Sequence, residues 1–189
     1  NDGMQTKLAG TVAVYDQLGV SMDVTTGILD TAMLSLGYDA QGSMDLVKQL
    51  DDTAVSLGKN ISDVFADFAS ASKKLLFYGT DMINVFRKLE MQSKDTGLSI
   101  DEILGLTEQF DTFEGAGKAV GKLNALLGGP YLNSIDMLNA TEAERMDMMK
   151  EAVDMSGVIF SDLSKYEQKA FAAALGTDVD TLRRSMGAL

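Results

Sequence analysis

Cysteine, histidine and tryptophan are absent from this chain of 189 residues, and proline occurs once, at Pro130. Histidine and cysteine supply most metal ligands and many enzyme nucleophiles, so their absence removes most metal-centred and nucleophilic chemistry. We therefore expect no metal site and no cofactor. The sequence also lacks an apolar run of about 18 residues and a signal-peptide pattern, so we expect no transmembrane segment.

Positive charge is scarce as well. The chain has 16 lysine and arginine residues against 28 aspartate and glutamate residues, a formal net charge of −12. Neutralising phosphates requires clustered cations, whereas basic pairs such as Lys73-Lys74 and Arg183-Arg184 are typical of solvated faces. We expect no direct nucleic-acid binding by this chain.

Apolar residues and glycine are plentiful, at 46% and 18 residues respectively. A chain of this length and composition can bury a proper core in one domain or in two small ones. The sequence begins at Asn1 rather than at methionine. We expect it to be a segment of a longer chain.

Glycines recur at regular intervals between helix-like segments. They stand at positions 19, 37, 58, 79 and 97, and each is followed closely by a Ser, Thr, Asn or Asp that can cap a helix. No alternating strand pattern is visible. The sequence predicts an all-α fold of multiple short helices joined by glycine-capped turns, arranged as a helical-hairpin array or bundle.

The spacing of these glycines has two interpretations. Gly19 to Gly58 and Gly58 to Gly97 are both 39 residues, a period typical of helical repeats. Helices of about 15 residues with short loops would give a similar spacing by coincidence. No established repeat signature decides between the two.

The strongest break in the sequence is Gly128-Gly129-Pro130, because proline cannot continue a helix. We place a boundary here, between a helical-hairpin region of residues 1–127 and a smaller C-terminal helical subdomain of residues 128–189. Ser/Thr-x-x-Glu/Asp capping boxes mark helix starts in the second region. They are Thr141 with Glu144, Ser164 with Glu167, and Thr177 with Asp180.

The stretch before this break contains the most helix-start and helix-end signals. Ser99 with Glu102 forms a capping box, and Asp111 with Glu114 repeats its spacing. The stretch therefore predicts two helices, roughly 99–109 and 111–127.

Positions spaced by three and four residues from Ile103 onward would form one stripe if the helix ran on. Gly117 and Gly121 lie in this pattern, each at a cost of about 1 kcal/mol relative to alanine, which suggests a packing reason. That reason is either a tight contact within the chain or a contact with a partner. The residues that we expect to make helix-packing or partner contacts are Phe110, Phe113, Gly117, Val120, Gly121, Leu123 and Leu127.

No pattern of side chains predicts catalysis. Closely spaced carboxylates such as Asp101-Glu102 and Asp111 with Glu114 coincide with helix N-termini, where the helix dipole favours acidic side chains. Met146, Met148 and Met149 suit either an irregular core or an adaptable partner contact. We assign no catalytic residue and expect the chain not to be an enzyme.

Three phrases in the second half carry a resemblance to a known family. They are FDTFEGAGKAVGKLNALLGG (110–129), YLNSIDMLNATEAER (131–145) and FSDLSKYEQKAFAAALG (160–176). Together they resemble a stretch of the tape measure proteins of tailed bacteriophages. Upstream, LGVSMDVTTGIL, SLGKNISDVFADF and TGLSIDEILGL are similar to the same region, so the resemblance covers about residues 18–187.

The resemblance implies a structural role in the virion. A tape measure protein takes part in tail assembly, sets tail length and leaves through the tail tube during DNA delivery. It implies self-association in several copies and contact with tail tube, hub or tail chaperone proteins. The implied location is the virion tail, with the host cytoplasm during assembly.

Two alternatives stay open beside it. A general helical protein-interaction module would account for the 39-residue spacing. A peptidoglycan-cleaving enzyme would use Glu114, but no second carboxylate in a supporting polar context accompanies that residue, as glycoside hydrolysis usually requires.

Overall fold

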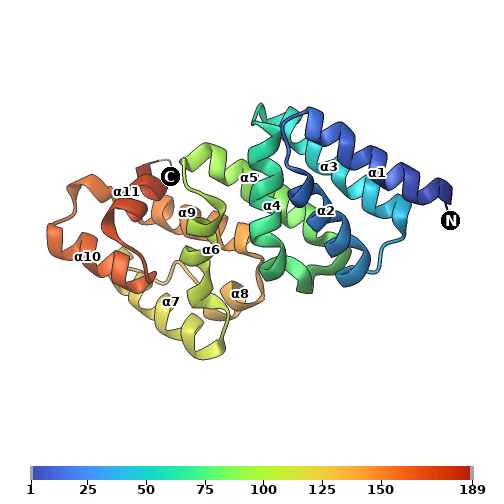
Figure 1. Ribbon diagram of the computed structural model, residues 1–189. Helices are drawn as coiled ribbons and strands as arrows, with labels where there is room; N and C mark the ends of the chain where they lie inside the picture. Colours follow the sequence, from blue (N-terminus) through green and yellow to red (C-terminus); the bar gives the residue numbers. More distant parts are fainter. Residues whose placement is uncertain (1, 188–189) are drawn as a thin grey trace. The chain divides into compact units, whose positions relative to one another are not determined.

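The computed structural model describes residues 2–187 and confirms an all-α fold (Figure 1). Within that range the regular elements are helices, without a β-strand. The α-helices are α1 (Asp2–Gln17), α2 (Met22–Asp30), α3 (Ala40–Leu57), α4 (Ile61–Leu75), α5 (Met82–Thr96), α6 (Ile100–Thr107), α7 (Phe113–Leu127), α8 (Ser134–Asn139), α9 (Glu142–Ser156), α10 (Lys165–Ala174) and α11 (Val179–Gly187). Between them lie a π-helical turn, η1 (Thr31–Ser35), and the 3₁₀ turns η2 (Leu76–Asp81), η3 (Glu108–Phe110) and η4 (Phe160–Asp162).

Most predicted helix starts are confirmed by their capping geometry. The side chains of Ser99, Thr141 and Ser164 each accept a hydrogen bond from the backbone N–H three residues later, and the glutamate there bonds back. One predicted box is wrong. Asp178, not Thr177, is the N-cap and accepts from the N–H of Thr181 at 2.8 Å, since aspartate is preferred to threonine at this position.

The predicted helix-ending glycines have positive φ. Gly58 is representative, with φ 62° and ψ 30°, and its N–H bonds to the carbonyls of Ala54 and Val55. Residues with a Cβ are strained in this left-handed region, so glycine is the residue that ends such a helix at least cost. The same positive φ occurs at 19, 37, 79 and 97, as the sequence predicts, and at 128, 157 and 176.

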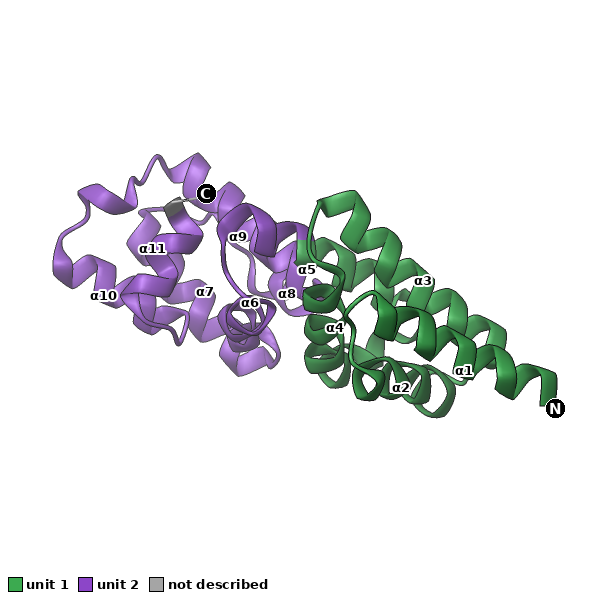
Figure 2. Cartoon of the chain, turned by 45° about the horizontal axis from the view of Figure 1, so that its top comes forward, with its two compact units in different colours: residues 1–90 green, residues 91–189 purple. Residues whose placement is uncertain are grey.

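The chain divides into two compact units, Asn1–Glu90 and Met91–Leu189 (Figure 2). This division differs from the predicted boundary at Gly128, which lies inside the second unit. There the side chain of Asn124 donates to the carbonyl of Leu132 and accepts from its N–H, at 2.8 and 2.9 Å. The Gly-Gly-Pro turn is thus closed by a paired amide and joins two packed helices, α7 and α8, instead of linking domains.

Unit 1 is built around the amphipathic helix α4. Its apolar face buries Phe65 and Phe68, and the ring of Phe68 meets Phe86 of α5 edge to face, with centroids 5.0 Å apart. α2 and α3 both pack on α4, and α1 packs on α2 and α3. Burying rings of this size is the main source of stability for the unit.

Unit 1 also buries a carboxylate. Glu90 of α5 is fully buried and forms an ion pair with Lys59, which lies 3.6 Å from Asp67 as well. Burial raises the pKa of Glu90 from 4.5 to about 7, although the hydrogen bond from Lys59 acts in the opposite direction. The other carboxylate oxygen, Oε1, has no hydrogen-bond partner.

Unit 2 has its own core. Its large buried side chains come from several helices and include Ile103, Phe110, Met137, Phe171 and Leu182. α7 packs on α8 and α10, α6 packs on α9, and α10 packs on α11. Met146 and Met149 are buried in this core, as the core interpretation of the methionines expects, whereas Met148 is only half-buried.

Candidate functional site

Helix α7 carries all the contact residues expected from the sequence except Phe110, which lies in η3, and the helix begins later than predicted. Its N-cap is Thr112, whose side chain accepts from the N–H of Gly115 at 3.0 Å, so the predicted pair of Asp111 with Glu114 is wrong by one residue. Gly115 is required here, because a Cβ would lie 2.5 Å from the carbonyl oxygen of Gln109. The chain therefore bends between η3 and α7, and the helix does not run on.

This bend shifts the phase of the predicted stripe. Phe110, Val120, Leu123 and Leu127 are buried as expected, together with Ala116 and Ala119. Phe113, by contrast, has 71% of its surface exposed, and Gly117 and Gly121 are exposed too. Phe110 thus lies in η3, and the other six expected residues lie on two faces of α7, one packed and one open.

A tight contact within unit 2 does not explain the two glycines. An added Cβ at Gly117 or at Gly121 would meet no atom within 4 Å. Nothing in unit 2 presses against these positions, so the other interpretation, contact with a partner, stays a prediction. Phe113, Gly117 and Gly121 are four residues apart and form one exposed row, which we call the open face of α7.

The open face of α7 offers shape and charge, without reactive groups. Phe113 is a single large apolar side chain at the start of the helix, and the two glycines leave a shallow strip beyond it. Glu114, Lys118 and Lys122 are exposed beside this row. The arrangement suits the close approach of another helix, and it contains no nucleophile paired with a base.

Arg145 holds the entry to α7 in place, and it was not identified from the sequence. Arg145 is buried, with 4% of its surface exposed. Its guanidinium donates to the carbonyls of Met137 at 2.8 Å and Leu138 at 3.2 Å, at the C-terminal end of α8. It also donates to the carbonyls of Thr107 and Phe110 and to the carboxylate of Asp111.

These bonds satisfy helix-end carbonyls that have no partner within their own helices. A guanidinium can serve several acceptors at fixed angles, which an ammonium group cannot. The only sequence signal for Arg145 is that it is the one basic residue in the TEAER segment, whose other charged residues are acidic. That signal does not separate a buried arginine from a solvated one.

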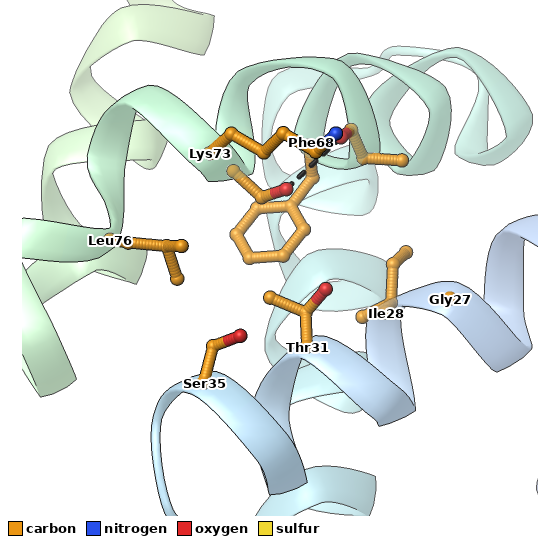
Figure 3. A pocket seen from close by; sticks show the side chains of 9 residues that line it. Gly27, Ile28, Thr31, Ser35, Phe68, Lys73 and Leu76 are labelled. Carbon is orange, nitrogen blue, oxygen red and sulfur yellow. Dashed lines mark hydrogen bonds between the residues drawn. The ribbon is translucent and has the colours of Figure 1, made fainter.

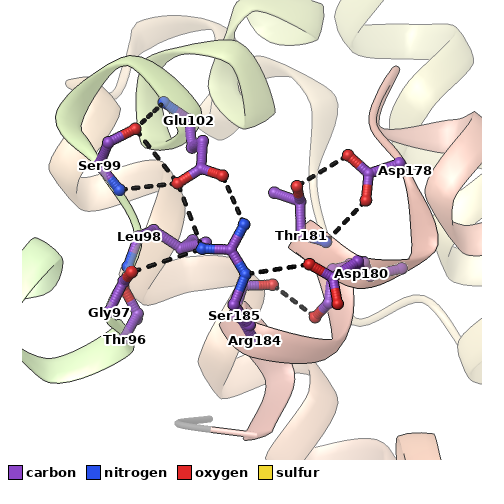
Figure 4. A network of polar contacts seen from close by, with 11 residues as sticks. Thr96, Gly97, Leu98, Ser99, Glu102, Asp178, Asp180, Thr181, Arg184 and Ser185 are labelled. Atoms are coloured by element: carbon purple, nitrogen blue, oxygen red, sulfur yellow. Dashed lines mark hydrogen bonds and ion pairs between the residues drawn. The ribbon is translucent and has the colours of Figure 1, made fainter.

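A second polar network joins α11 to the start of α6 (Figure 4). The carboxylate of Glu102 accepts from the N–H of Ser99 at 2.8 Å and from the guanidinium of Arg184. The hydrogen bonds from Arg184 and Ser99 lower the pKa of Glu102. Arg184 also lies 3.4 Å from Asp180 and donates to the carbonyl of Gly97.

Glu102 therefore has a structural task, as its position in a capping box predicts.

Among residues 2–187, no group of three or more Asp, Glu, His or Cys side chains is placed to hold a metal ion. In the same range, no helix has the length and apolar character needed to cross a membrane. Comparison with models of protein families, with curated proteins and with solved structures found no match.

Proposed function

We propose that this chain is a segment of a tape measure protein from a tailed bacteriophage, with a structural role in tail assembly, tail-length determination and DNA delivery. The observation that carries the proposal is the resemblance of residues 110–129, 131–145 and 160–176 to that family. The all-α fold is compatible with it. In this proposal the chain acts by packing, in the virion tail, after assembly in the host cytoplasm.

The partner contact in this proposal is the open face of α7. It belongs to the first of the resembling phrases, and its glycines cost stability without a packing reason inside unit 2. The contacting surface is another copy of the chain or a tail tube, hub or chaperone protein. The chain itself carries out no reaction.

The first experiment asks whether the chain belongs to a tail. Mass spectrometry of purified virions of the parent phage should find peptides of this segment in the tail fraction. Sequencing should place the gene among tail genes. A short free-standing gene without neighbouring tail genes, or virions without the segment, would refute the proposal.

The second experiment asks whether the open face makes the contact. Gly121→Leu in the parent gene adds a bulky side chain at an exposed position, so the chain should fold while tails fail to assemble. Gly10→Leu is the matched control, because Gly10 is also an exposed helical glycine with open space around it. Normal tails with Gly121→Leu would remove the open face from the proposal.

A general helical protein-interaction module is the second candidate. Each 39-residue interval holds a pair of helices, α2 with α3 and α4 with α5, which favours it. Size-exclusion chromatography with light scattering separates the two candidates, since a monomer that captures one cellular peptide fits this one. An assay on purified peptidoglycan tests the cleaving activity directly. We expect the native protein and Glu114→Gln both to leave the polymer uncut.

A further inference from the structure

A cavity of about 310 Å³ opens between α2 with η1 and α4, entirely within unit 1. Figure 3 shows the ring of Phe68 between Lys73 and Leu76 on one side and Ile28 and Thr31 on the other. Its volume is at the lower end of the range for small-molecule pockets. The lining residues are Gly27, Ile28, Thr31, Ser35, Phe68, Ala69, Ser72, Lys73 and Leu76.

One wall of the cavity is a glycine that packing does not require. Gly27 lies inside α2 without a positive φ, and a Cβ there would meet nothing within 4 Å. Alanine would stabilise the helix by about 1 kcal/mol at such a position. The missing side chain leaves this wall of the cavity open.

Among the polar residues that line the cavity, Lys73 and Ser35 are exposed and Thr31 is half-buried. In the described chain, the ammonium group of Lys73 has no ion pair, and the hydroxyls of Thr31 and Ser35 make no hydrogen bond. The hydroxyl of Ser72 donates to the carbonyl of Ala69 at 3.0 Å, so only its lone pairs are available. No carboxylate lines the cavity, although the chain carries a net charge of −12.

The backbone is irregular at the same place. Thr31 and Ser35 belong to the π-helical turn η1, closed by a bond of 3.2 Å from the N–H of Leu36 to the carbonyl of Thr31. Short π-helical turns are rare and occur frequently at functional sites. The irregular turn, the unrequired glycine and the unpaired cation thus meet at one cavity.

We propose that this cavity binds a small organic monoanion, a carboxylate on a short apolar body. Lys73, an exposed side chain on the lining of the cavity, pairs with the carboxylate. The apolar body lies against Ile28 and Leu76, above the buried ring of Phe68. This inference is independent of the role in a phage tail.

Sodium hexanoate is the probe, titrated into the whole chain and followed by amide proton–nitrogen NMR spectra. Saturable shifts should be confined to the amides of α2, η1 and the second half of α4. Hexan-1-ol, which has a matching apolar body and no charge, should bind more weakly by up to about fivefold, the upper end of what one exposed ion pair contributes. Absence of saturable shifts, or equal affinity for acid and alcohol, would overturn the proposal.

Two pairs of variants separate binding from folding. Lys73→Gln should abolish the preference for hexanoate over hexan-1-ol, whereas Lys74→Gln should keep it, since Lys74 does not line the cavity. Gly27→Leu should fill the cavity and lower the affinity at least tenfold without loss of thermal stability, whereas Gly10→Leu should leave affinity unchanged. Equal effects of the two lysine variants, or full affinity in Gly27→Leu, would contradict the assignment.

Discussion

Glu90 and Arg145 are both buried ionisable side chains, but their surroundings differ. Arg145 is surrounded by carbonyl and carboxylate acceptors from three segments of unit 2. Glu90 has Lys59 on one oxygen and no partner on the other. A buried charge is tolerated when its hydrogen-bonding capacity is filled and is costly when it is not. The two residues should therefore respond in opposite ways to removal of their charge.

Removing the charge of Glu90 should flatten the pH dependence of stability. Because the pKa of Glu90 is raised from 4.5 to about 7, the folded chain keeps a proton between these values that the unfolded chain has released. The free energy of unfolding should therefore fall by up to about 3 kcal/mol as pH rises from about 4.5 through 7. Urea unfolding at pH 5 and pH 8 measures this fall, and Glu90→Gln should lack it.

Glu114→Gln is the control for Glu90→Gln, since Glu114 is exposed on the first turn of α7. It should keep the pH dependence of the native chain. If Glu90→Gln kept the full dependence too, the buried carboxylate would not be its source.

Removing the guanidinium of Arg145 should destabilise unit 2 strongly. Arg145→Met leaves the carbonyls of Thr107, Phe110 and Met137 without their donor, at an expected cost of about 3–5 kcal/mol in urea unfolding. Arg145→Lys should recover only part of this loss, because an ammonium group cannot reach all the acceptors. Arg183→Met is the exposed control and should change stability by less than about 0.5 kcal/mol.

At the scale of elements, the glycines of α7 have different tasks. Gly115 gives room to the carbonyl oxygen of Gln109, whereas Gly117 and Gly121 face open space. Gly117→Ala and Gly121→Ala should each stabilise the isolated chain by up to about 1 kcal/mol, and Gly115→Ala should destabilise it. Thermal unfolding followed by circular dichroism tests all three. A loss of stability in Gly117→Ala equal to that in Gly115→Ala would show that the open face is packed after all.

Helix ends were predictable from the sequence, whereas the face that each helix buries was not. The capping signals at Ser99, Thr141 and Ser164 act through neighbours three residues away, so a local pattern contains the whole interaction. The exposure of Phe113 depends on a bend set by Thr112 and Gly115, where two capping signals one residue apart compete. The contacts of Arg145 reach back as far as Thr107, which no local pattern encodes.

At the scale of the whole molecule, the division into units was not predictable either. It falls within α5, between Glu90 and Met91, where the helix continues without a glycine, a proline or a cap. Gly128-Gly129-Pro130 gives a stronger local signal, but it forms a tight turn inside unit 2. Glycine, proline and capping residues indicate where a helix ends, whereas a unit is defined by which helix faces bury one another.

Because each unit has its own core, damage to one core should stay local. Phe68→Ala should cost about 3–5 kcal/mol and lower the amide hydrogen-exchange protection of α2, α3 and α4 in unit 1. Protection of α9, α10 and α11 in unit 2 should change little, and Phe171→Ala should give the reverse pattern. Equal loss of protection across the chain in both variants would show a single cooperative unit.

The absence of cysteine has a mechanical consequence when it is combined with the glycine turns. No covalent cross-link ties one helix to another, so tension applied at both ends would peel helices from their neighbours one after another. The unravelled thread would be no wider than a single helix, about 10–12 Å. The bore through which this chain can be drawn is therefore set by the width of a single helix and not by the width of either unit.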